Sequence, residues 1–128
     1  MMIDLHPEKC NICGGKAIYT TNDKIYHGKQ YGSGYCYLCT ECGAYVGTHK
    51  PRPKEALGIL ANEEMREWKI RCHDEFDKLW GDGEQRKQLY KRLSKELNIS
   101  IKECHFGYFD LDILKKSYEI IKLWEDDL

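Results

Sequence analysis

The spacing of the cysteines constrains this chain more than any other feature. Cys10 and Cys13 form one C-x-x-C pair, Cys39 and Cys42 form a second, and a glycine follows each pair. Two thiolates separated by two residues can reach one ion from a tight turn, and a tetrahedral Zn²⁺ ion takes four such ligands. The glycine lets the backbone turn without a Cβ clash. The pattern therefore predicts a zinc ribbon whose single ion is structural, because four thiolates leave no position for water.

Two aspects of the cysteine pattern stay open. Cys36 and Cys39 are also spaced as C-x-x-C, but only Cys42 is followed by a glycine, as Cys13 is. We therefore pair Cys39 with Cys42 and expect Cys36 to be a buried strand residue. The alternatives to zinc are free thiols, a redox pair or an iron–sulfur cluster. Disulfides are disfavoured, because the number of cysteines is odd at 7 and they cluster at two-residue gaps.

Composition indicates a folded protein of about one domain. The 128 residues include 12% aromatics, which supply apolar surface for a core. No apolar run is long enough to cross a membrane, and the first residues lack the regions of a signal peptide, so we expect a cytoplasmic protein with no membrane partner. Residues 1–54 carry 7 basic and 4 acidic side chains, whereas residues 55–128 carry 13 and 17. The only basic patch expected is thus a mild one in the first half, and binding to nucleic acid by charge alone should be weak.

The two halves also differ in their predicted secondary structure. The first half is rich in Gly and Tyr, and short strands are expected at residues 16–21, 34–38 and 44–49. Residues 26–34 carry three glycines and are expected to form a loop or hairpin tip. The join at residues 50–54 contains two prolines and is expected to be extended.

The second half has the apolar periodicity of helices. One helix is expected from Asn62, a plausible N-cap, to about Trp80, and a second over about residues 84–97. Ser100 to Glu103 fits a capping box for a short turn, and Asp110 is expected to cap the last helix. The expected core positions are Met65, Trp68, Cys72, Phe76 and Leu79 in the first helix, Leu89, Leu93 and Leu97 in the second, and Ile113, Ile120 and Trp124, with Leu114, Tyr118 and Ile121 beside them, in the last.

The predicted fold class is therefore α+β. An N-terminal four-cysteine zinc ribbon of short antiparallel strands, residues 1–50, is expected to pack on a C-terminal bundle of about three helices, residues 51–128. We expect residues 1–128 to form one zinc-containing domain and one cooperative unit, because neither half has a large core of its own.

A polar stripe lies on the first predicted helix. Arg66, His73, Asp77 and Trp80 recur at helical spacing, about 100° from the core positions. His73 and Asp77 are one turn apart and could share a hydrogen bond, which would favour a charged imidazole. The stripe is either an acid–base or phosphate-binding surface or an ordinary polar pair on a solvated face.

Two further candidates precede the last helix. His105 and Asp110 lie at element ends, where functional residues often sit, although His105 could equally cap a helix or bond a backbone carbonyl. A second metal site from His73, Cys104, His105 and His49 is conceivable, but no spacing demands it. A nucleophilic Cys104 is weaker still, because side chains adjacent in sequence rarely face each other.

Tyrosines alternate with basic residues in the first half. Lysines and an arginine interleave with tyrosines 19, 26, 31, 35, 37 and 45. Aromatic platforms beside basic groups suit single-stranded nucleic acid. The equally weighted alternative is that these rings form the thin core of the ribbon and cover its faces.

Several stretches together resemble the zinc-finger-containing domain family of phage and prophage proteins. They follow the two C-x-x-C pairs in the order CGAYVGTH (42–49), LGILAN (57–62), HDEFDKLW (73–80) and CHFGYFD (104–110). The resemblance covers nearly the whole chain and implies one zinc-bearing domain, an origin in a mobile element and, for a phage-encoded protein, action in the host cytoplasm. It supplies a site pattern without a mechanism. The positions that it singles out are His49, Asn62, His73, Asp77, Trp80, His105 and Asp110.

Three functions fit these observations. The first is a zinc-stabilised phage-type binding module that acts on nucleic acid or on a nucleoprotein complex. The second is a phage-encoded inhibitor that binds a host protein, for example of a defence system, in which the acidic helices could mimic nucleic acid. The third, less favoured, is an enzyme that uses His73, Asp77, His105 and Asp110.

Overall fold

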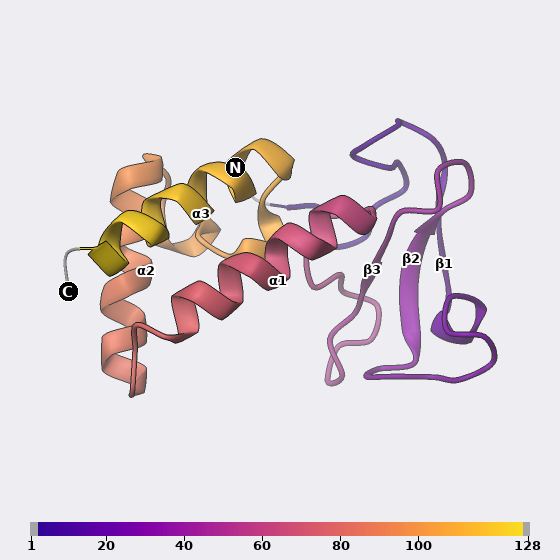
Figure 1. Ribbon diagram of the computed structural model, residues 1–128. Coiled ribbons are helices and arrows are strands. Elements are labelled where there is room, and N and C mark those ends of the chain that lie inside the picture. The colour runs from indigo at the N-terminus through magenta and orange to yellow at the C-terminus, as the bar shows by residue number, and fades with distance from the viewer. Residues whose placement is uncertain (1–2, 127–128) are drawn as a thin grey trace. The chain divides into compact units, whose positions relative to one another are not determined.

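Three strands are followed by three main helices, as the sequence predicts (Figure 1). The computed structural model describes residues 3–126. Its elements are β1 (Ala17–Thr21), β2 (Tyr35–Cys39), β3 (Tyr45–Gly47), α1 (Glu63–Asp77), α2 (Gly83–Leu97) and α3 (Leu111–Asp126), with the short 3-10 helices η1 (Asn22–Lys24), η2 (Ile101–Glu103) and η3 (Phe106–Tyr108). The predicted α+β fold class is confirmed.

The chain divides into two compact units. The first, which we call the ribbon unit, ends at Glu63, and the second, the helical unit, begins at Glu64. That the two unfold together as one domain stays a prediction.

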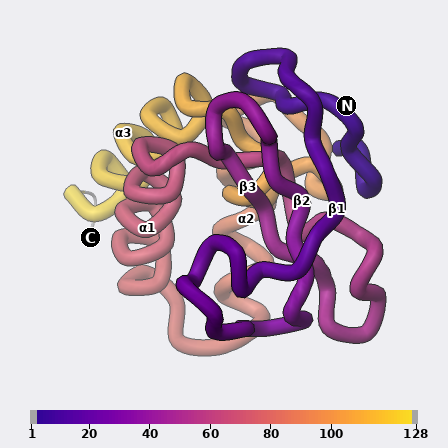
Figure 2. The backbone as a smooth tube through the Cα atoms, turned by 90° about the vertical axis from the view of Figure 1, so that its right-hand side faces the viewer, coloured from indigo at the N-terminus to yellow at the C-terminus, as the bar shows by residue number. Residues whose placement is uncertain are grey.

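The sheet of the ribbon unit is a three-stranded antiparallel meander. Strand β2 lies between β1 and β3, as Figure 2 shows. In this register Tyr37 of β2 is opposite Tyr19 of β1 and Val46 of β3. Tyr, Thr, Val and Ile dominate the strands because their bulky or branched side chains pack well on a pleated surface. The predicted strand at 44–49 is shorter than expected, since the ladder stops at Gly47.

A small apolar core covers one face of this sheet. Its buried members are Cys10, Ala17, Tyr37, Cys39, Ala44, Val46, Ala56 and Leu60. Two of them are cysteines of the predicted metal site, and only Tyr37 and Leu60 are large. So small a core gains a large share of its stability from a bound ion.

The prediction that the join at residues 50–54 is extended is wrong. The segment turns back, with the Glu55 N–H donating to the Arg52 carbonyl at 2.9 Å, and it belongs to the ribbon unit. The hydroxyls of Tyr19 and Tyr37 each donate to a carbonyl of this loop, at 2.7 and 2.6 Å. These bonds from distant strands fix the turn, whereas the prolines constrain only their immediate neighbours.

The three main helices begin directly after the residues expected or observed to cap their N-termini. Helix α1 begins directly after Asn62, as predicted, but ends at Asp77, three residues short of the expected end. Asp82 caps α2 by accepting from the Gln85 N–H at 2.8 Å. The predicted cap of α3 is confirmed, because Asp110 accepts from the Ile113 N–H at 3.0 Å. Across the described residues no helix has the length and apolar character needed to cross a membrane.

The predicted capping box at Ser100 does not form. The 3-10 helix η2 is present, but the Ser100 side chain makes no capping hydrogen bond. Its backbone carbonyl instead accepts from the Glu103 N–H at 3.1 Å. In a single 3-10 turn the backbone already satisfies this donor, so the side-chain cap is redundant.

The three helices bury one continuous core within the helical unit. Its buried members include Phe76, Leu93, Cys104, Phe106, Phe109, Leu114, Ile121 and Trp124. Polar contacts join the helices: the Cys72 thiol donates to the Leu114 carbonyl at 3.3 Å, and the Trp124 Nε1–H donates to Glu96 at 2.9 Å. On α3 the buried stripe passes through Leu114, Ser117, Ile121 and Trp124. The expected stripe through Ile113 and Ile120 is therefore displaced, and both residues are half-buried.

Candidate functional site

The two C-x-x-C-G segments fold into the same turn. The Gly14 N–H donates to the Cys10 carbonyl at 3.0 Å, and the Gly43 N–H donates to the Cys39 carbonyl at 3.2 Å. Both glycines have left-handed backbones, with φ of +76° and +80°. A residue with a Cβ would be strained at either position. The glycine after each pair is therefore what lets both turns close.

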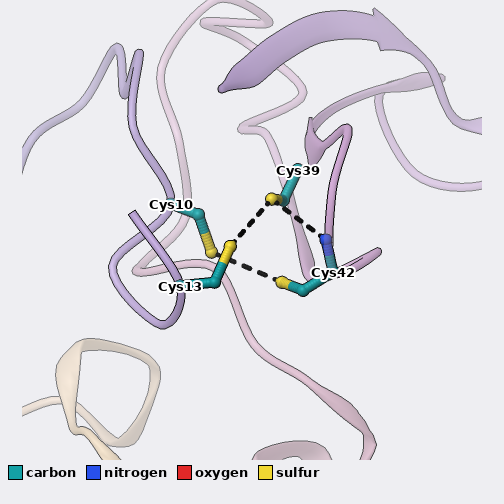
Figure 3. Close-up of side chains that lie close together, drawn as sticks. All are labelled: Cys10, Cys13, Cys39 and Cys42. Atoms are coloured by element: carbon teal, nitrogen blue, oxygen red, sulfur yellow. Dashed lines mark hydrogen bonds between the residues drawn. The ribbon is translucent and has the colours of Figure 1, made fainter. Parts of the chain in front are cut away.

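The four thiols converge on one point, as Figure 3 shows. Their Sγ atoms all lie within 4.8 Å of one another. Cys10 and Cys42 are 3.6 Å apart, and Cys13 and Cys39 are 3.4 Å apart. A tetrahedron with Zn–S bonds of about 2.3 Å has edges of about 3.8 Å. The four sulfurs therefore fit one tetrahedral zinc ion, and with all four bound the coordination shell is closed.

Backbone N–H groups stabilise the thiolates. Ile12 N–H points at Cys10 Sγ at 3.4 Å, and Gly15 N–H points at Cys13 Sγ at 3.3 Å. The N–H groups of Cys42 and Glu41 both lie 3.4 Å from Cys39 Sγ. These bonds, that from Cys42 foremost, lower the pKa of Cys39 to about 6. Burial and the neighbouring thiols raise the pKa of Cys42 to about 12, and the Cys39 thiol raises that of Cys13. Because the thiolate is the form that binds metal, the turns favour metal binding most directly at Cys39.

A closed shell of four thiolates on a short antiparallel sheet defines a structural zinc-binding module. A scan against known families matches residues 6–124 to the zinc-finger-containing domain family. This match spans most of the chain, which therefore belongs to that family. Searches of curated proteins and of solved structures found no match.

The other three cysteines lie outside the metal site. Cys36 is 1% exposed on β2, which confirms the prediction of a buried strand residue. Burial raises the pKa of Cys72 to about 12 and that of Cys104 to about 11. Both thiols are therefore neutral near pH 7, and neither has the thiolate character of a nucleophile.

The structure does not form the hydrogen bond expected between His73 and Asp77. Asp77 instead accepts from the Trp80 Nε1–H at 2.9 Å. The His73 ring packs edge-on against Phe106, with centroids 4.8 Å apart. Burial of this side of the ring lowers the pKa of His73 more than the Asp77 charge raises it, although the residue as a whole is exposed. The spacing of His73 and Asp77 suggested a pair that favours the imidazolium. The structure does not form such a pair.

His105 lies at the start of η3 and contacts aromatic rings. It is 4.7 Å from the Tyr108 centroid and 6.4 Å from that of Tyr90. Its side chain does not cap η3. Burial, and then the charge of Arg86, lower the pKa of His105. Because Arg86 also lowers the pKa of His73, the two histidines share one electrostatic environment.

The remaining predicted positions belong to different parts of the fold. His49 donates its backbone N–H to the Glu55 carbonyl at 3.1 Å, in the ribbon unit. Arg66 is half-buried on α1, Asn62 precedes that helix, and Asp110 caps α3. Within residues 3–126, only the four-cysteine group brings three or more possible metal ligands together. The second metal site suggested from His73, Cys104, His105 and His49 is therefore not formed.

Sequence reasoning missed Arg86. Its guanidinium lies 4.9 Å from the Tyr90 centroid and 5.7 Å from that of Trp80. Arg86 and Tyr90 are four residues apart on α2, a spacing that places them on one face. The i,i+4 spacing of Arg86 and Tyr90 is the sequence feature that could have identified Arg86. On an exposed helix, however, many solvated pairs have the same spacing.

Proposed function

We propose that this zinc-stabilised module binds single-stranded nucleic acid through the ribbon unit. The observation that carries the proposal is a pair of stacked, exposed tyrosines. The rings of Tyr19 and Tyr35 lie 5.3 Å apart and 5° from parallel. They are 39% and 38% exposed, so part of each ring is open to a ligand.

A basic loop is anchored beside this aromatic pair. The Tyr19 hydroxyl donates to the Pro53 carbonyl at 2.7 Å, and Lys50, Arg52 and Lys54 are exposed on the same loop. Arg52 pairs with Glu55 at 3.1 Å. Neither lysine has a carboxylate partner among the described residues, so both keep their charge for a ligand. We call Tyr19, Tyr35, Lys50, Arg52 and Lys54 the tyrosine–loop surface.

This combination matches the chemistry of a single strand. Every base has a π face that can stack on an aromatic ring, and each phosphate is attracted to a nearby ammonium group. A duplex hides its base faces, so the stacked tyrosines favour a single strand. With few cations at the surface, binding should be modest and should weaken as salt rises. Zinc supports the surface by holding the small ribbon in shape.

The family resemblance supports three further hypotheses about origin and partner. They are a phage or prophage source, action on a nucleoprotein complex, and inhibition of a host defence protein. The inhibitor hypothesis differs in one testable respect, since it needs no affinity for nucleic acid.

Removing one ring of the stack should weaken binding. We expect Tyr35→Ala to cost about 1–3 kcal/mol of binding free energy, the usual value of one stacked base. That is at least a fivefold rise, by rough conversion, in the Kd for a fluorescent oligo(dT) or oligo(U) measured by anisotropy.

The double variant Lys50→Gln with Lys54→Gln should flatten the salt dependence of log Kd, because fewer cations then contact phosphates.

Tyr31→Ala is the matched control for this experiment. Tyr31 is 55% exposed on the same unit, but its ring packs against Tyr26 and is not part of the stacked pair. This variant should bind as the unchanged protein does. Equal affinity of the unchanged protein and Tyr35→Ala, or no salt-sensitive binding at all, would overturn the proposal and favour a protein partner.

A further inference from the structure

A groove on the helical unit is lined by both cationic and apolar side chains. It encloses about 410 Å³ between the first turns of α2 and the segment around η2. Arg86, Lys87 and Lys91 line it from the helix, and Ile101, Cys104 and His105 line it from the opposite segment. The volume suits a small organic molecule.

The groove is positively charged although this half of the chain is acidic. Among the described residues, Glu84 is the one carboxylate in its lining, and it accepts a hydrogen bond from Gln88 at 3.3 Å. Ion pairs elsewhere in the helical unit use Lys78, Lys115 and Lys122. In the described part of the chain, no carboxylate lies within ion-pair distance of the three cations of the groove. Their charge is therefore available to an anion.

Arg86 is held in place by its neighbours. The ring of Tyr90 lies 4.9 Å below its guanidinium, and the Tyr90 hydroxyl is 3.5 Å from one of its nitrogens. A guanidinium fixed against an aromatic ring loses little freedom when it binds an anion in its fork of donors. Burial and then the charge of Arg86 depress the pKa of His105, which lines the same groove.

The floor of the groove is apolar. Tyr90 and Ile101 contribute carbon surface, and Cys104 is a buried thiol whose pKa is raised to about 11 by burial, so it is uncharged. Ile101 is 54% exposed, so its side chain is open to a ligand. A flat or ring-shaped body that covered this floor would remove that apolar surface from water.

We propose that this groove binds a small organic anion of nucleotide size. Its anionic group is held by Arg86, Lys87 and Lys91, and its apolar body packs against Ile101 and the part of Tyr90 that lines the groove. The site lies in the helical unit and does not depend on the tyrosine–loop surface of the ribbon unit. It is a further ligand site in this protein, distinct from the zinc site.

Titration with uridine monophosphate, followed by amide NMR shifts of the zinc-loaded full-length protein, tests this site. We expect shifts concentrated at residues 84–91 and 101–105. Uridine without the phosphate and inorganic phosphate without the base should each bind at least about tenfold more weakly, since each keeps only half of the contacts. Lys87→Gln with Lys91→Gln should weaken binding of the nucleotide about tenfold through loss of two charged contacts.

Lys95→Gln is the matched control, because Lys95 is an exposed lysine of the same helix outside the groove. It should leave the Kd unchanged. Shifts spread outside residues 84–105, an equal loss in the control, or uridine binding as tightly as its monophosphate would each overturn the proposal. So would a response of these amides to oligo(U) but not to the mononucleotide.

Discussion

The Cys42→Ser variant is expected to lose its zinc ion and the folded structure of the ribbon unit. A serine hydroxyl stays protonated at neutral pH and is a poor ligand for zinc, so the site keeps only three thiolates. A structural zinc ion contributes on the order of 10 kcal/mol to folding in small domains. Whole domains are stable by only about 5–15 kcal/mol. The core of the ribbon unit, in which Cys10 and Cys39 are themselves buried members, is too small to offset this loss.

Zinc content and the amide NMR spectrum of residues 3–63 measure this outcome. The matched control is Cys36→Ala, which removes a buried cysteine from β2 that lies outside the sulfur cluster. It should keep the zinc and cost about 1 kcal/mol of stability as a packing change. A folded, zinc-loaded Cys42→Ser protein would contradict the assignment, and loss of zinc from Cys36→Ala would identify Cys36 as a ligand.

The second large effect is expected in the helical unit. Phe76 of α1 is fully buried, 4.5 Å from the Tyr90 ring and 5.5 Å from that of Phe106. Phe76→Ala leaves a cavity where α1, α2 and η3 meet, and such changes cost about 3–5 kcal/mol. In a domain of this size, each 1 kcal/mol lowers Tm by roughly 4 °C or more. Tm should therefore fall by more than about 10 °C.

Thermal unfolding followed by circular dichroism at the helical band measures this change. Ile70→Ala on the same helix is the control, because Ile70 is 60% exposed. Its Tm should stay within a few degrees, as expected for a surface substitution of about 0.5 kcal/mol or less. Equal melting temperatures for Phe76→Ala and the unchanged protein would mean that Phe76 is not the core residue described here.

The sequence predicted the features that depend on local spacing. Two C-x-x-C-G pairs were enough to identify the four sulfurs that converge, because the turn after each pair is set by its own residues. Asp110 at the start of α3 was predictable for the same reason, since an N-cap bonds only two or three residues ahead. The order of strands and helices followed from periodicity and composition.

The errors lie where residues distant in the sequence decide the local structure, or where a helix ends earlier than its pattern predicts. The loop at residues 50–54 turns because the hydroxyls of Tyr19 and Tyr37 reach its carbonyls from two strands. Asp77 bonds Trp80 because α1 ends at Asp77, so Trp80 lies beyond the helix. The cationic groove was missed because it combines residues of α2 with residues around η2, which no single helical period brings together.

The central claim is that one zinc ion, held by Cys10, Cys13, Cys39 and Cys42, organises the ribbon unit. Native mass spectrometry of the purified protein, before and after a strong chelator, tests it most directly. The predicted result is a single zinc ion per chain, lost on chelation together with a shift to the highly charged species of an unfolded segment. A chain that carries no metal, two zinc ions or an iron–sulfur cluster, or one whose charge distribution is unchanged when zinc is removed, would contradict the claim.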